Sequence, residues 1–187
     1  MSTNSEPIEA LADELLAIRC QLGERAAFDV LIARWHEPVW RYLRRLANSD
    51  DVASDLSQDT WIRVLRGIGA LREPGKLRPW LFGIARRVAM DRLRFEYVRR
   101  GADDVEIDEL PADDATQDLE VDLAAIDTAL AVLPVSEREM LTLFYLRELS
   151  LAEIAALLAM PVGTVKSRLY RARLELRRAL ETRGAFT

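Results

Sequence analysis

The sequence has little of what builds metal centres and covalent cross-links. Its 187 residues include one cysteine, Cys20, and one histidine, His36. A lone cysteine excludes an intramolecular disulfide and a cysteine-based zinc site, and one histidine cannot form a histidine cluster. We therefore expect no metal and no cofactor, and we interpret both residues as ordinary packing or surface residues.

Membrane segments and sheet signals are also missing. No apolar run approaches the ~18 residues that a membrane-spanning helix needs, and the N-terminus carries acidic residues where a signal peptide is basic. This predicts a cytoplasmic protein without membrane insertion. The sequence contains no Asn-Gly or Asp-Gly hairpin signal and long stretches of Leu, Ala, Arg and Glu. We therefore expect an all-α fold.

The net charge of -5 is unevenly distributed. Residues 101–122 hold 10 of the 31 acidic residues and no Lys or Arg, whereas residues 23–100 carry +6 and residues 123–187 carry +2. The acidic stretch also contains Gly101, Pro111 and only scattered apolar residues, so it should not fold alone and is interpreted as a flexible linker. It is either a solvated spacer or a mimic of phosphate that occupies a basic channel of a partner.

The linker divides the chain into two small helical domains, at 23–100 and 123–187, with residues 1–22 as an extension. Helical spacing of apolar residues from Phe28 to Leu46 predicts the first helix of a bundle, with Pro38 expected to bend or restart it. Residues 48–51 should end that helix and cap the next, which runs from about 52 to 68. A third amphipathic stretch covers about 79 to 99.

The second domain shows the pattern of a helix-turn-helix. A helix is expected over 123–133, and Ser136–Glu139 and Ser150–Glu153 both match the capping box that begins a helix. Residues 160–163 then predict a turn, followed by a last helix from about Thr164. On that helix Val165, Leu169, Ala172 and Leu176 recur at spacings of four, three and four, which predicts the face that docks on the preceding helices.

The other face of the last helix carries small, hydroxylated and cationic residues. Such residues near the start of a recognition helix can meet base edges and phosphates in the DNA major groove. A merely solvated basic face is the alternative, but the preceding capped helix and the short turn favour DNA reading. The candidate DNA-binding residues are Gly163, Thr164, Lys166, Ser167, Arg168 and Arg171.

The residues from 133 to 180, and above all the string VGTVKSRLYRAR, resemble region 4 of the extracytoplasmic-function (ECF) sigma factors, which recognises the minus-35 promoter element. A similar pattern occurs in LuxR-type regulators, so this half alone leaves open a helix-turn-helix regulator that does not join core RNA polymerase. The string DVASDLSQDTWIRVLRGI in the first half resembles sigma region 2.2, which docks on the clamp helices of the polymerase β′ subunit. A response regulator would have an alternating βα domain there, so the first half favours the sigma factor.

Two further sets of candidate residues follow from the first half. Polar acceptors beside apolar groups suit a partner's arginines, and the candidates for core polymerase binding are Asp55, Gln58 and Asp59. Residues 71–94 resemble regions 2.3 and 2.4, which open and read the minus-10 element. Cations and an aromatic suit single-stranded DNA, and the candidates are Arg72, Lys76, Arg78, Trp80, Arg86 and Arg87.

Two of these residues have open alternatives. Trp80 lies at helical spacing with Leu81 and Ile84, and we favour a place in the core for it. Arg87 stands where the family usually has Asn, so the family's base preference does not carry over, and we hypothesise a phosphate contact instead.

The resemblance implies a sigma subunit without enzymatic activity, because phosphoryl transfer belongs to the polymerase and its magnesium. Its expected partners are core RNA polymerase, through the β′ clamp helices and the β subunit, promoter DNA, and an anti-sigma factor. The acidic linker would thread the active-site cleft and the RNA exit channel of the polymerase.

Overall fold

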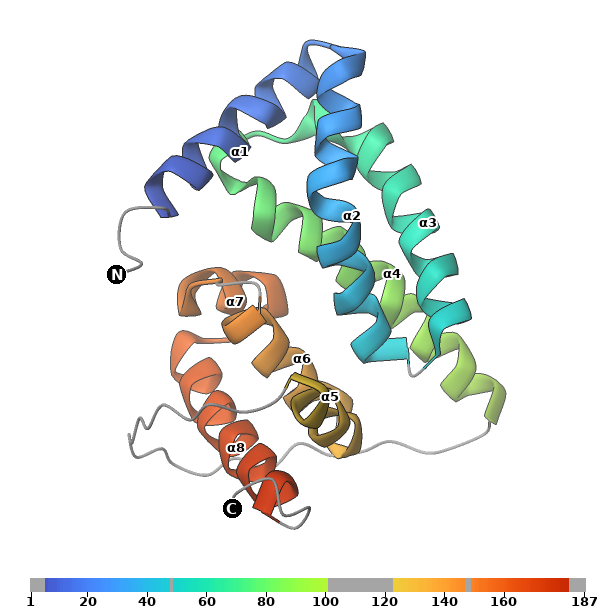
Figure 1. The fold of residues 1–187 in the computed structure, drawn as a ribbon, viewed down its shortest axis with the longest axis vertical. Coiled ribbons are helices and arrows are strands. Elements are labelled where there is room, and N and C mark those ends of the chain that lie inside the picture. The colour runs from blue at the N-terminus through green and yellow to red at the C-terminus, as the bar shows by residue number, and fades with distance from the viewer. Residues whose placement is uncertain (1–5, 48, 101–122, 147–148, 182–187) are drawn as a thin grey trace. The chain divides into compact units, whose positions relative to one another are not determined.

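The computed structural model describes residues 6–47, 49–100, 123–146 and 149–181. These residues form helices and turns and contain no strand, which confirms the all-α prediction. The chain divides into two compact units, 1–96 and 97–187. Figure 1 shows the helices of each unit. The acidic linker at 101–122 lies outside the described residues.

The first unit contains four long helices and two single 3-10 turns. In chain order they are α1 (Glu6–Gln21), α2 (Arg25–Ala47), α3 (Asp50–Gly67), η1 (Ile68–Ala70), η2 (Pro74–Lys76) and α4 (Leu77–Arg100). Its core is centred on Phe82, which lies edge-on to Tyr42 and Trp35 with ring centroids 5.4 and 6.1 Å away. Such edge-to-face pairs add to the burial of the rings.

The predicted stripe on α2 is largely confirmed. Leu31, Trp35, Val39, Leu43 and Leu46 are buried, although Phe28 and Ile32 are only half-buried. The restart expected at Pro38 is wrong, because α2 runs through it as one helix. Pro38 removes one backbone donor, but Trp35 and Val39 on either side of it are buried and keep the helix docked across the interruption.

The helix α1 buries one face and exposes another. Its buried residues are Asp13, Leu16, Ala17 and Cys20. A row of large apolar residues on the opposite side is exposed to solvent: Ile8, Leu11, Leu15, Ile18 and Leu22. α1 contacts α2, η1 and η2. Residues 6–21 are therefore a packed helix of the first unit.

The second unit contains α5 (Leu123–Val132), α6 (Val135–Leu141), a π-helical turn η3 (Thr142–Leu146), α7 (Leu151–Leu158) and α8 (Val162–Glu181). The capping box at Ser150 is confirmed: its hydroxyl accepts from the Glu153 backbone N–H at 3.2 Å, and the Glu153 carboxylate accepts from the Ser150 backbone N–H at 2.8 Å. These bonds satisfy donors at the start of α7.

The capping box predicted at Ser136 is wrong. α6 begins earlier, with Pro134 as its N-cap, and Ser136 lies inside the helix. Glu139 is buried, and the Ser136 hydroxyl donates instead to the Glu137 carboxylate at 2.7 Å. The neighbouring Arg138 is buried as well and donates from Nη2 to the carbonyls of Ala131 and Leu133 at 3.2 and 2.8 Å. Both carbonyls lie at the end of α5, where helices leave acceptors unpaired.

The turn of the helix-turn-helix is shorter than the sequence suggests. α7 ends on Ala159, which has a left-handed φ of 54°, and α8 begins at Val162, two residues before the predicted start. The backbone N–H of Met160 donates to the carbonyl of Ala155 at 3.0 Å and closes the helix end. Gly163 therefore belongs to the first turn of α8. In the described parts of the chain no helix is both long and apolar enough to cross a membrane.

Candidate nucleic-acid and protein interfaces

The helix α8 docks on its unit through Val165, Leu169 and Ala172, which are buried as predicted, with Leu176 half-buried. The six candidate residues lie within the first three turns of α8. Gly163 and Lys166 are exposed, while Thr164, Ser167, Arg168 and Arg171 are half-buried. The start of the helix thus presents hydroxyl groups and cations away from its docking face, which is the composition that phosphate and base contacts require.

Cations further along α8 are engaged with neighbouring side chains. The Arg173 guanidinium lies 5.6 and 5.3 Å from the ring centroids of Phe144 and Tyr145. Arg177 pairs with Glu181 at 2.8 Å and Arg178 with Glu175 at 3.0 Å. The carboxylates offset part of this positive charge, so the cationic character of α8 is concentrated in its first half.

Gly163 is not required by the packing of the unit. A Cβ built at this position would meet no heavy atom within 4 Å. The bare backbone at the start of α8 therefore faces open space. A backbone without a side chain at the positive end of a helix dipole lets an anion approach closely.

The exposed face of α3 carries the three candidate acceptors. Asp55, Gln58 and Asp59 are all exposed. Leu56, which lies between these acceptors in the sequence, does not supply the apolar surface expected beside them, because it is only 6% exposed and faces the interior with Ala53 and Thr60. The exposed apolar residues of α3 are Ile62 and Leu65, at 40% and 43%. Ile62 follows Gln58 by one helical turn and so shares its face.

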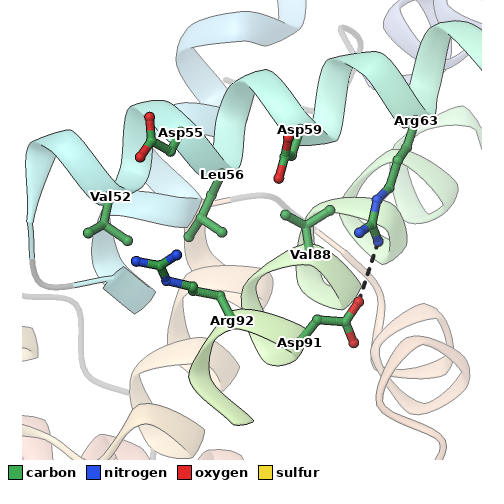
Figure 2. A pocket seen from close by; sticks show the side chains of 8 residues that line it. All are labelled: Val52, Asp55, Leu56, Asp59, Arg63, Val88, Asp91 and Arg92. Atoms are coloured by element: carbon green, nitrogen blue, oxygen red, sulfur yellow. Dashed lines mark hydrogen bonds and ion pairs between the residues drawn. The ribbon is translucent and has the colours of Figure 1, made fainter. Parts of the chain in front are cut away.

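A hollow of about 180 Å³ lies between α3 and α4 beside these acceptors. Figure 2 shows Leu56 and Val88 as its apolar wall, Asp55 and Asp59 on α3, and Asp91 and Arg92 on α4. Arg63 pairs with Asp91 at 3.4 Å across the two helices, whereas neither Asp55 nor Asp59 pairs with another residue drawn in the figure. Asp91 and Arg92 were missed by sequence reasoning, because only the fold brings α4 beside α3.

The candidate residues of the minus-10 segment are spread over its surface. Arg72, Lys76 and Arg87 are exposed, and Trp80 and Arg86 are half-buried. A Cβ on Gly67 would lie 3.5 Å from Trp80 Cζ2, so the indole packs against the end of α3. Trp80 is thus only partly buried and is not among the core residues, where the sequence favoured it. Phe82, its neighbour in the sequence, is fully buried in the core.

Arg78 is engaged by carboxylates of α1. Its Nε donates to Asp13 Oδ2 at 2.7 Å and its Nη2 to Glu9 Oε2 at 3.1 Å, and its guanidinium lies 5.4 Å from the Trp35 ring centroid. Burial alone would lower the pKa of Arg78, but the hydrogen bonds and charges of Asp13 and Glu9 outweigh it and raise that pKa above its usual value. Asp13 is 2% exposed and also forms an ion pair with Arg34 Nε at 3.1 Å.

No group of three or more His, Cys, Asp or Glu side chains that could hold a metal ion occurs among the described residues. The Cys20 thiol is buried, and this burial raises its pKa. The candidate interfaces therefore consist of cations, carboxylates and apolar side chains. Such surfaces suit the binding of nucleic acid and protein.

Comparisons with known proteins match both halves of the chain. The family models described as "Sigma-70 region 2" and "Sigma-70, region 4" match residues 31–97 and 123–176. The chain is 34% identical over 167 residues to the ECF RNA polymerase sigma factor SigM of Mycobacterium tuberculosis, covering 89% of this chain and 83% of that protein. It is 30% identical over 181 residues to the ECF RNA polymerase sigma-E factor of Haemophilus influenzae, covering 88% and 93%.

The fold is also similar to that of a solved sigma factor. The sigma factor RpoE of Bartonella quintana, solved in complex with the anti-sigma factor NepR, superposes with a TM-score of 0.67 at 26% identity, covering 82% of this chain and 96% of that chain.

Proposed function

The chain belongs to the ECF family of sigma factors, and on that premise we propose which of its residues make the contacts of a sigma factor. As a member of this family it binds core RNA polymerase and promoter DNA and directs promoter-specific initiation of transcription. A LuxR-type regulator is not favoured, because both sigma regions match in one chain.

We assign recognition of the minus-35 element to the start of α8. The observation that carries the assignment is the group of six small, hydroxylated and cationic residues on its first three turns, opposite the buried Val165 and Leu169. Lys166 is exposed, and Gly163 leaves room for a phosphate. The first residues of a recognition helix reach base edges, and the later ones hold phosphates.

Binding of core polymerase is assigned to the exposed acceptors of α3. Asp55 and Asp59 pair with no other residue around their hollow, so their carboxylates are available to a partner's guanidinium groups. The exposed Ile62 beside Gln58 supplies apolar contact surface. Charged acceptors next to an apolar residue are the arrangement that protein interfaces use for arginine.

The contact with melted minus-10 DNA is assigned to the exposed cations Arg72, Lys76 and Arg87, with the half-buried Trp80 as the aromatic on which a base could stack. Arg86, which precedes Arg87 in the sequence, is half-buried, and Arg78 is bound by Asp13 and Glu9. The acidic linker at 101–122 is proposed to occupy the basic channels of the polymerase. An anti-sigma factor is a further proposed partner, supported by the complex of the similar RpoE with NepR.

Separation of two binding activities tests these assignments. Asp59→Lys should weaken binding of purified core polymerase by about 30-fold or more, because it places a cation opposite the partner's arginines. It should leave minus-35 duplex binding by the assembled holoenzyme intact when polymerase is in excess. Asp29→Lys, a charge reversal at an exposed position of α2, is the matched control and should bind core normally.

The reverse pattern is expected for Lys166→Ala. Loss of one phosphate or base contact should weaken minus-35 binding about tenfold and leave the affinity for core polymerase unchanged. A chain that fails to bind core polymerase, or variants that lose both activities together, would contradict the proposed function.

A further inference from the structure

The helix α1 holds the segment between α3 and α4 at two points. At the first, Gln21 Nε2 donates to the backbone carbonyls of Ile68 and Leu71 at 3.1 and 2.7 Å. At the second, Asp13 and Glu9 bind Arg78, the second residue of α4. The two points bracket residues 68–78, which include the exposed cations Arg72 and Lys76.

The bracketed segment has few restraints of its own. It consists of the single turns η1 and η2, and it contains Gly69, Pro74 and Gly75. The turn η1 is closed by a backbone bond from Leu71 N to Ile68 O at 3.1 Å, and η2 by bonds from Lys76 N to Glu73 O at 2.9 Å and from Leu77 N to Pro74 O. Short 3-10 turns are weakly held by their own hydrogen bonds. Contacts from elsewhere in the unit therefore decide the shape of the segment.

The position of Arg78, the second of these contacts, depends on carboxylates of α1 for electrostatic reasons. A cation in the first turn of a helix opposes the helix dipole, and Arg78 lies in the first turn of α4. The Asp13 carboxylate, buried beside it, offsets both the dipole and the guanidinium charge. Arg78 is held in this place by a residue 65 positions earlier in the chain.

We propose that α1 is a positioning element for the minus-10 contact, with Gln21 and Asp13 as its positioning residues. This inference rests on the proposed role of Arg72 and Lys76 in binding the melted strand. A segment fixed at both ends presents its cations in one arrangement, and binding then does not have to order it. If either contact is lost, the cations are still present, but the segment is no longer fixed in the arrangement that binds the melted strand.

Substitutions of Gln21 separate this role from simple packing. Gln21→Met keeps the length of the side chain and removes the donor, and Gln21→Glu keeps its shape and replaces the donor with an acceptor that faces two carbonyls. Gln21→Arg restores donors to the position. Leu22→Ala is the matched control, because Leu22 is the neighbouring residue, is 74% exposed and lies outside these contacts.

Each variant is assembled with core polymerase, and its affinity is measured for a promoter fragment whose minus-10 region is already unpaired. The promoter is first selected with the wild-type holoenzyme from a randomised library. We expect Gln21→Met and Gln21→Glu to lower this affinity about five- to tenfold, which is the effect of losing one to two hydrogen bonds. Gln21→Arg and Leu22→Ala should stay within about twofold of the wild-type affinity. Core binding and duplex minus-35 binding should not change.

Three results would overturn the proposal. The first is wild-type affinity for the unpaired promoter in the Met and Glu variants. The second is an equal loss in all three substitutions of Gln21, since this indicates packing and not hydrogen bonding. The third is a parallel loss of core binding, since this indicates misfolding. A wild-type holoenzyme that selects no promoter would instead contradict the proposed function itself, and the two failures are therefore distinct.

Discussion

Removal of the Asp13 carboxylate should destabilise the first unit strongly. Asp13 is 2% exposed and lies between two guanidinium groups, those of Arg78 at 2.7 Å and Arg34 at 3.1 Å. In Asp13→Ala both cations lose their buried counter-charge, and α1 loses the ion pairs of Asp13 with Arg34 on α2 and Arg78 on α4. In Asp13→Asn the side chain keeps its size and one acceptor oxygen, but it loses the charge, and the amide NH2 can no longer accept from a guanidinium.

The magnitude follows from the exposure of the partners. Breaking a fully buried ion pair by removing one member costs about 3–5 kcal/mol. The side chains of Arg78 and Arg34 are 21% and 33% exposed, so water partly solvates them once the carboxylate is gone. We therefore expect the free energy of unfolding to fall by about 2 kcal/mol in Asp13→Ala, which is below that range. Asp13→Asn should lose somewhat less, because the amide oxygen still accepts a hydrogen bond.

The assay uses a feature of the full chain. All four tryptophans, Trp35, Trp40, Trp61 and Trp80, lie in the first unit, so tryptophan fluorescence during urea denaturation reports on that unit directly. With a denaturant slope of about 1–2 kcal/mol per M for a unit of this size, the urea midpoint should fall by about 1–2 M. The slope itself should not change.

The matched control is Glu9→Ala. Glu9 binds the same arginine, but its side chain is 53% exposed, and exposed ion pairs contribute about 0–1 kcal/mol. Its midpoint should therefore stay close to that of wild type. The reasoning is refuted if Asp13→Ala shifts the midpoint no more than Glu9→Ala does, since burial of the pair would then have no energetic consequence.

Three further predictions concern single positions. Ser150→Ala removes the confirmed capping box of α7 and should lower the stability of the second unit by about 1 kcal/mol, measured by the loss of helical circular dichroism. Ala159→Gly relieves a left-handed φ of 54° and should raise the stability of that unit by about 0.5–1 kcal/mol in the same measurement; a decrease would show that the turn is not strained. Because burial raises the pKa of Cys20, its thiol should react with a disulfide reagent at pH 8 far more slowly than in the urea-unfolded chain, and Asp13→Ala should speed the reaction by loosening α1. The raised pKa also means that the unfolded chain loses this proton first, so stability should decline as the pH rises past about 9.

Local patterns predicted the helices well where the chain carries its own signals. The stripe from Leu31 to Leu46, the cap expected within residues 48–51 and the capping box at Ser150 all depend on residues a few positions apart. The structure confirms them and identifies Ser49 as that cap. The failure at Ser136 has the opposite cause. A serine followed three residues later by a glutamate is not sufficient when the glutamate is buried by tertiary packing and a proline has already begun the helix.

The candidate interfaces were predictable to the extent that one helix carries them. The residues of α8 share a face because they lie three and four positions apart, and the acceptors of α3 are exposed for the same reason. The hollow that joins Asp55 and Asp59 to Asp91 and Arg92 depends on how α4 crosses α3. No spacing within either helix contains that information.

The helix α1 is the clearest case in which tertiary packing overrides a local pattern, because its periodicity favours the wrong face. Its large apolar residues from Ile8 to Leu22 recur at three and four positions, the pattern of a buried stripe, yet they are exposed. The buried face instead carries Asp13 with the smaller Ala17 and Cys20. A buried carboxylate is unfavourable unless cations compensate it, and here the cations are Arg34 on α2 and Arg78 on α4. The orientation of α1, and with it the reach of Gln21 to the carbonyls of Ile68 and Leu71, therefore depends on charges brought together only in the folded unit.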